Sequence, residues 1–211
     1  MPRVLLINAN TTRSVTDLLE HHARKATGGR VELKAVTAAF GAPYVASEAA
    51  YAVAGHAALD ALERHVEGCD AVLLACFGDP GLFALREVSR VPVLGMAEAS
   101  LAEAAKRGRF SIVTGGPAWK PMLERLAVAL GFGDKLVRVN ALPLSGPELA
   151  NHTHLVEEAV RQEAADAVII GGAALAGVAA RLQPKVAVPL IDSVACSAMA
   201  AAELAQRRMA A

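Results

Sequence analysis

The sequence predicts an α/β protein built on parallel sheets, and three observations point to this class. Short apolar runs alternate with helical patterns along all 211 residues. Most of these runs are continuous and rich in Val, Ile and Leu, as expected of strands buried on both faces of a parallel sheet. The segments between them are rich in Ala, which suits helices that pack closely onto a sheet.

Eight segments are predicted to be strands because each is a short apolar run. They cover residues 4–8, 31–36, 71–76, 91–96, 110–114, 136–140, 167–171 and 186–191. Six helices are predicted between or after them, at residues 14–27, 47–66, 97–107, 118–130, 154–165 and from 193 to the C-terminus. In such βα alternation, ligands bind at the carboxyl ends of the strands.

The two halves of the chain resemble each other. Three pairs of segments align in one order at nearly one offset: 70–81 with 166–177, 91–95 with 188–192, and 3–8 with 110–114. We therefore expect two pseudo-symmetric, Rossmann-like α/β domains with the site in the cleft between them. The predicted first domain is 1–95 plus 193–211, and the second is 96–192.

Composition excludes several classes of protein. The 21 Lys and Arg residues balance 21 Asp and Glu residues, which argues against a nucleic-acid partner because phosphate binding needs a basic face. A chain that is 54% hydrophobic is not disordered. No apolar run approaches the roughly 18 residues of a membrane helix, and the N-terminus is not a secretory signal. We expect a cytoplasmic protein with no membrane partner, and the apolar composition favours a homo-oligomer.

The three cysteines have different expected roles. An odd number without metal spacing indicates reduced thiols and no disulfide framework. Cys69 lies in a helix-to-strand turn, and Cys196 lies in the Ala-rich last helix, so both are predicted to pack. Cys76 ends the most apolar strand of the chain.

The residues after Cys76 suggest chemistry. Gly78 permits unusual backbone angles, and Asp79-Pro80 is typical of an N-cap followed by a first helical residue. A helix N-terminus there would favour a thiolate and could hold an oxyanion. The alternative is a buried, unreactive cysteine.

Polar residues also follow other strands. Asn8, Asn10 and Thr11 lie at the end of the first strand. They are predicted to bind a carboxylate or amide, unless Thr11, Thr12 or Ser14 only caps the next helix. Thr114 and Gly115 end a strand in the second half, as a binding loop or a plain turn. The long loop 40–48 could cover the cleft, or its Ser47 could cap a helix.

No metal or nucleotide cofactor is predicted. His152 and His154 form a pair, but no third ligand has suitable spacing. A dinucleotide fingerprint, a phosphate loop and a Gly-x-Ser-x-Gly motif are all absent from the sequence.

Taken in order, these motifs resemble the aspartate/glutamate/hydantoin racemase superfamily, and most of all its hydantoin and allantoin racemase branch. The resemblance rests on the segments 7–11, 40–48, 75–81, 114–117, 171–177 and 188–192. It implies two pseudo-symmetric domains, no cofactor, and two thiols that face each other across the α-carbon of the substrate. One thiol removes a proton and the other delivers one, and Cys76 matches the first.

The sequence departs from the family at the second thiol, because Gly172 stands where the pattern has Cys. The lead prediction is a cofactor-independent racemase or isomerase with Cys76 as acid/base, acting on a hydantoin, amino acid or dicarboxylate-like small molecule. Thr114, His56 or a water could replace the lost base. The predicted substrate-binding residues are Asn8, Asn10, Thr11, Phe77, Gly78, Thr114, Gly115, Gly172 and Ala173.

The missing thiol leaves other functions open. A one-thiol enzyme could be a lyase similar to the arylmalonate decarboxylases, or a cis–trans isomerase similar to the maleate isomerases. A protein that kept the cleft and lost half of the chemistry would be a non-catalytic small-molecule binding protein.

Overall fold

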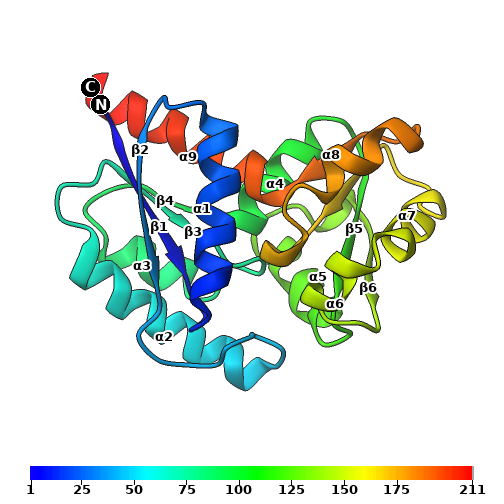
Figure 1. Cartoon of the computed structure of the whole chain (residues 1–211), viewed down its shortest axis with the longest axis horizontal. Helices are drawn as coiled ribbons and strands as arrows, with labels where there is room; N and C mark the ends of the chain where they lie inside the picture. Colours follow the sequence, from blue (N-terminus) through cyan, green and yellow to red (C-terminus); the bar gives the residue numbers. More distant parts are fainter. Residues whose placement is uncertain (211) are drawn as a thin grey trace.

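A computed structural model describes residues 1–210 as two α/β halves, each built on a four-stranded parallel sheet (Figure 1). Residue 211, the end of the predicted first domain, lies outside the described residues. The first sheet has the order β2-β1-β3-β4, formed by β1 Arg3–Asn8, β2 Glu32–Thr37, β3 Ala71–Leu74 and β4 Val93–Gly95. The second has the order β6-β5-β7-β8, formed by β5 Phe110–Gly115, β6 Leu136–Leu142, β7 Ala167–Ile170 and β8 Leu190–Asp192. The predicted fold class is confirmed.

The six predicted helices are present with small changes of boundary. They are α1 Arg13–Thr27, α2 Glu48–His65, α4 Met96–Ala105, α5 Trp119–Ala129, α7 Thr153–Arg161 and α9 Ser193–Ala210. Two short helices were not predicted, because they have too few turns for a periodic apolar pattern: α6 Gly146–Asn151 and α8 Val178–Leu182. The helix expected directly after Asp79 is α3 Leu82–Val88. The 3₁₀ turns are η1 Gly133–Lys135, η2 Ala173–Leu175 and η3 Gln183–Lys185. None of the helices within residues 1–210 is long and apolar enough to cross a membrane.

The sequence repeat produces the same contacts in both halves. Asp70 precedes β3, and its carboxylate accepts a hydrogen bond of 2.7 Å from the N–H of Arg3. Asp166 precedes β7, and its carboxylate accepts a hydrogen bond of 2.7 Å from the N–H of Arg109. In each half an equivalent aspartate therefore helps to hold a buried central strand beside the first strand.

The fourth strand of each half follows a proline. The carbonyl groups of Pro92 and Pro189 each accept a backbone bond of 2.9 Å from the central strand, at Val72 and Val168. Both strands start directly after the proline, later than predicted. Proline lacks the N–H that a strand within a parallel sheet donates to its neighbour.

The last helix packs mainly beside the first sheet. Helix α9 contacts α1, α4, β1, β3 and β4, and it also contacts β8 of the second sheet (Figure 1). Helix α4 follows β4 along the chain and contacts β7 and β8 of the second sheet. The division of the chain at residues 95 and 193 stays a prediction.

Asp79 connects the segment after Cys76 to α4. The prediction that Asp79 caps the next helix is wrong, because α3 begins only at Leu82, after a left-handed Gly81. The buried Asp79 carboxylate instead accepts hydrogen bonds from the N–H groups of Ala97 (2.9 Å) and Glu98 (2.8 Å). It thereby satisfies two of the free donors at the start of α4. Asp79 itself adopts a positive φ of 54°, so this cap is formed at some cost in backbone strain.

We expect Asp79→Ala to lower the free energy of unfolding by about 2 kcal/mol, because two buried N–H groups lose a shared acceptor. The measurement is urea denaturation at pH 8. The matched control is Asp17→Ala, which removes an exposed carboxylate paired with Arg13 at 2.9 Å and should cost at most about 0.5 kcal/mol. Equal losses in the two variants would contradict the role assigned to Asp79.

Candidate active site

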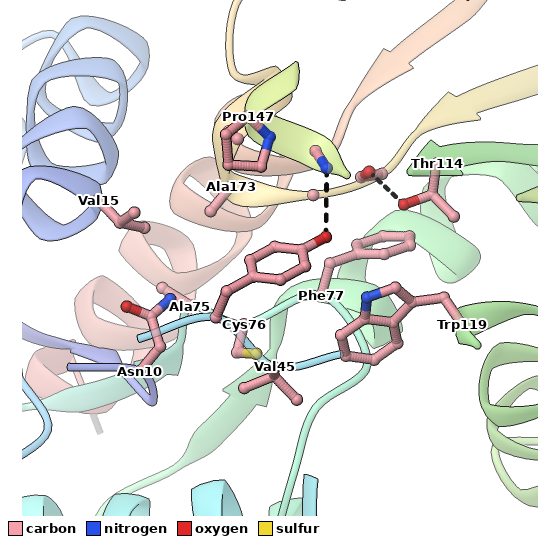
Figure 2. Close-up of a pocket in the computed structure, with 15 residues that line it drawn as sticks. Asn10, Val15, Val45, Ala75, Cys76, Phe77, Thr114, Trp119, Pro147 and Ala173 are labelled. Atoms are coloured by element: carbon pink, nitrogen blue, oxygen red, sulfur yellow. Dashed lines mark hydrogen bonds between the residues drawn. The ribbon is translucent and has the colours of Figure 1, made fainter. Parts of the chain in front are cut away.

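A cavity lies between the two halves, where the strands of both sheets end (Figure 2). Asn10 follows β1, Cys76 follows β3, Thr114 lies in β5 and Gly172 follows β7. The repeat thus brings the carboxyl ends of equivalent strands to a shared space, where α/β proteins bind ligands. The predicted site residues that line this cavity are Asn10, Cys76, Phe77, Thr114, Gly172 and Ala173.

Four predicted site residues, Asn8, Thr11, Gly78 and Gly115, lie behind the cavity wall. Gly78 packs so closely under the Trp119 ring that a Cβ there would overlap it. A Cβ on Gly115 would lie 2.7 Å from the backbone nitrogen at the start of α6. The N–H of Thr11 donates to a carbonyl of the loop before α2. These residues support the wall without reaching the cavity.

Asn8 acts by positioning Asn10. The buried Asn8 amide donates to Asn10 Oδ1 at 3.0 Å, and Asn8 Oδ1 accepts from the Asn10 N–H at 3.2 Å. Asn10 Oδ1 also accepts from the N–H of Thr12 at 2.9 Å. The two hydrogen bonds that Asn10 Oδ1 accepts fix the orientation of the amide. Its Nδ2 donates to no acceptor within residues 1–210 and remains available to a ligand.

The predicted side-chain cap of the first helix is absent. Thr12 is the N-cap residue of α1, but no side chain within residues 1–210 caps this helix. The Thr12 hydroxyl donates to the carbonyl of Pro43 at 2.7 Å instead. The polar residues after β1 therefore serve the cavity and the neighbouring loop, and the alternative of helix capping by Thr11, Thr12 or Ser14 is wrong.

Cys76 is a buried thiol at the edge of the cavity. Cys76 is 8% exposed, and α3 begins only at Leu82. Burial, with a smaller contribution from the Asp79 carboxylate, raises the pKa of Cys76 to about 12. Burial therefore disfavours a thiolate in the free protein, and the expectation that a helix N-terminus stabilises the sulfur stays a prediction.

The other candidate acid/base groups lie elsewhere. Cys69 lies before β3, and Cys196 on α9 lies 3.6 Å from the carbonyl of Ala99; burial raises the pKa of both thiols. Exposed His56 packs edge-to-face against Phe40 and does not line the cavity. Within residues 1–210, no group of three His, Cys, Asp or Glu side chains could hold a metal ion.

At position 172, where a second thiol would lie, the second half presents only backbone to the cavity. A Cβ at Gly171 would overlap the Phe77 ring, so glycine is needed there for the close approach. Gly172 has a φ of 125°, which L-residues rarely adopt. A Cβ on Gly172 would have space, with Thr114 Oγ1 the nearest atom at 3.8 Å. The backbone conformation, and not crowding, opposes a side chain at position 172.

Two aromatic residues of the cavity, Tyr44 and Trp119, were not among the predicted site residues. Tyr44 lies in loop 40–48, which was expected to cover the cleft or to cap a helix. Both expectations hold in part, because Ser47 caps α2 by accepting from the N–H of Ala50 at 3.1 Å, while Tyr44 and Val45 line the cavity. Trp119, at the start of α5, follows no pattern that points to a site.

The cavity is uncharged. No Asp, Glu, Lys, Arg or His belongs to the part of its wall that residues 1–210 describe. The backbone N–H groups of Cys76, Phe77, Ala173 and Ala174 donate to no acceptor within the same residues. Such a site offers neutral donors and apolar surface to a ligand that carries carbonyl groups.

Known proteins are similar to this chain in sequence and in architecture. The sequence model of the family described as Asp/Glu/Hydantoin racemase matches residues 4–201. The hydantoin racemase of Pseudomonas sp. (strain NS671) is 32% identical over 202 residues, which cover 91% of this chain and 81% of that protein.

Two solved structures are also similar. The allantoin racemase from Klebsiella pneumoniae has a TM-score of 0.88 at 30% identity and covers 100% of this chain and 88% of its own. The allantoin racemase from Pseudomonas fluorescens has a TM-score of 0.90 at 27% identity and covers 97% of this chain and 91% of its own. With a family match over nearly the whole length, the chain belongs to the Asp/Glu/Hydantoin racemase family.

Proposed function

We propose that this protein is a cofactor-independent racemase for a hydantoin-type ring, in which Cys76 transfers the proton at the carbon next to a carbonyl group. One observation carries the proposal: Cys76 follows a central strand and lines an uncharged cavity between the two halves, beside unbonded backbone N–H groups. Family membership and the named activities of the relatives support a racemase.

The lining favours a neutral ring over an amino acid or a dicarboxylate. A free amino acid would need partners for its ammonium and carboxylate groups, because an unpaired charge is costly in an apolar site. A dicarboxylate would need cations, which the described wall of the cavity does not supply. A hydantoin carries carbonyl and N–H groups without a full charge, and an apolar substituent on it would pack against Phe77 and Trp119. This preference weakens the alternatives of a malonate lyase and a maleate isomerase.

The residues of the cavity can support proton transfer in distinct ways. Removal of the ring proton places negative charge on the neighbouring carbonyl oxygen. The Asn10 Nδ2 and the free N–H groups of Phe77 and Ala173 are donors of the kind that stabilise such an oxygen. Cys76 supplies the acid or base at the carbon itself.

We expect Cys76→Ala to reduce racemisation at least 100-fold, because general acid–base groups contribute about 10²–10⁴. The measurement is circular dichroism of each enantiomer of 5-benzylhydantoin, with NMR detection of deuterium uptake at C5 in heavy water. The control variant is Cys69→Ala, which removes a thiol outside the cavity and should leave racemisation unchanged. Absence of exchange above the protein-free background in wild-type protein, for both enantiomers, would contradict the proposed function.

The pH dependence of Cys76 reactivity follows from its raised pKa. Because burial raises the folded pKa to about 12, the thiolate fraction should increase about tenfold per pH unit throughout the range from pH 7 to 9.5. We expect the rate of iodoacetamide alkylation at Cys76, followed by peptide mass spectrometry, to rise by that factor without a plateau. A blocked cysteine peptide, whose thiol has a pKa of about 8.5, should level off in the upper part of the range. A plateau for Cys76 below pH 8 would contradict this assignment.

A further inference from the structure

Racemisation needs an acid/base group on each face of the reacting carbon, and Cys76 supplies only one. At position 172 the wall of the second half carries no side chain. Besides Cys76, two side chains of the described wall carry a hydroxyl proton that could be transferred, Thr114 and Tyr44.

Thr114 is poorly suited to the second role. Its hydroxyl donates to the carbonyl of Gly171 at 2.8 Å, so its proton is already engaged. An aliphatic hydroxyl is also a far weaker acid than a thiol or a phenol, which ordinarily titrate at about 8.5 and 10. Thr114 therefore serves to hold the backbone that precedes Gly172.

Tyr44 has the free proton that Thr114 lacks. Its phenol oxygen accepts a hydrogen bond of 3.2 Å from the N–H of Gly146 at the start of α6, drawn as a dashed line in Figure 2. Within residues 1–210 its own O–H donates to no acceptor. The bond leaves the proton available and would stabilise the oxygen after the proton has left.

The phenol reaches across the cleft from the first half. Tyr44 belongs to the loop between β2 and α2, but its oxygen lies at the wall formed by the second half, beside Gly146. Cys76 lies on the other side of the cavity from Pro147 and Ala173 in Figure 2. A ring bound between the two walls would have the sulfur toward one face and the phenol oxygen toward the other.

Contacts on both sides hold this loop in place. The carbonyl groups of Ala42 and Pro43 accept from the turn after β1, at 3.1 and 2.7 Å. Val45 is 3% exposed. Past the loop, Glu48 forms an ion pair with Arg125 of the second half at 2.9 Å. The position of the phenol is therefore set by more than its own hydrogen bond.

We propose that Tyr44 is the second acid/base residue of this protein and takes the place of the thiol that is absent at position 172. This assignment rests on the proposed function. In one direction the Cys76 thiolate takes the C5 proton, the C–H electron pair passes into the enolate, and the Tyr44 O–H gives its proton to the opposite face. In the other direction the Tyr44 phenolate takes the proton and the Cys76 thiol returns one, so no oxidant or cofactor is needed.

The test is Tyr44→Phe with the two enantiomers of 5-benzylhydantoin in heavy water. Racemisation should fall at least 100-fold. The enantiomer whose C5 proton faces Cys76 should still exchange it for deuterium with retention of configuration, and the other enantiomer should not exchange. Cys76→Ala should show the opposite preference. A merely structural role of Tyr44 would not create such one-sided exchange.

Arg125→Ala is the matched control, since it removes another tie between this part of the first half and the second half, the ion pair with Glu48, and Arg125 does not line the cavity. It should lower the exchange of both enantiomers in the same proportion. The assignment is overturned if Tyr44→Phe racemises at the wild-type rate, or if it slows both exchanges equally as the control does. If wild-type protein exchanges neither enantiomer, the proposed function fails and the Tyr44 assignment fails with it. If wild-type protein exchanges both enantiomers and Tyr44→Phe does not show one-sided exchange, only the Tyr44 assignment fails.

Discussion

The cap formed by Asp79 on helix α4 is the contact on which the arrangement of the cavity depends. Asp79 follows Cys76 closely in the chain, and its carboxylate binds two N–H groups of a helix that packs against the second sheet. The segment carrying the thiol is thus fixed to the element that connects the halves. Burial raises the pKa of Asp79 to about 7, while its two N–H donors favour the charged form. At neutral pH this carboxyl is therefore divided between its charged and neutral forms, and its hydrogen bonds go to the helix and not to a ligand.

The two halves share a scaffold and differ in their chemistry. Asp70 and Asp166 make the same contact with equivalent strands, and each half has the same strand order. At the ends of the central strands the symmetry breaks, with Cys76 on one side and Gly172 on the other. A symmetric scaffold does not require symmetric acid/base groups, because a side chain from a loop can occupy the space that a strand end leaves empty.

Sequence patterns predicted the fold well because buried parallel strands leave a strong local signal. The eight strands are short apolar runs, the six longer helices are Ala-rich segments between or after them, and the repeat between residues 70–81 and 166–177 predicted two equivalent halves. The patterns failed where tertiary contacts override local preference. Asp79-Pro80 has the residues of a helix start, yet the aspartate caps a helix that lies farther along the chain. Tyr44 lies in a loop without periodicity, so its approach to Gly146 is visible only in three dimensions.

The uncharged cavity wall and the raised pKa of Cys76 have a common physical cause. With no cation in the described wall, a thiolate there lacks a counter-charge, and burial disfavours it. A second negative charge in the same cavity would raise the free-energy cost further. A relay from thiolate to enolate to phenolate avoids this, because it carries a single negative charge through every stage. Neutral donors are then sufficient: unbonded N–H groups near Cys76 and Ala173 can stabilise the charge in the middle, and the N–H of Gly146 stabilises it at Tyr44. The absence of a second thiol is consistent with this scheme, since the relay needs one proton acceptor at each end and not two identical ones.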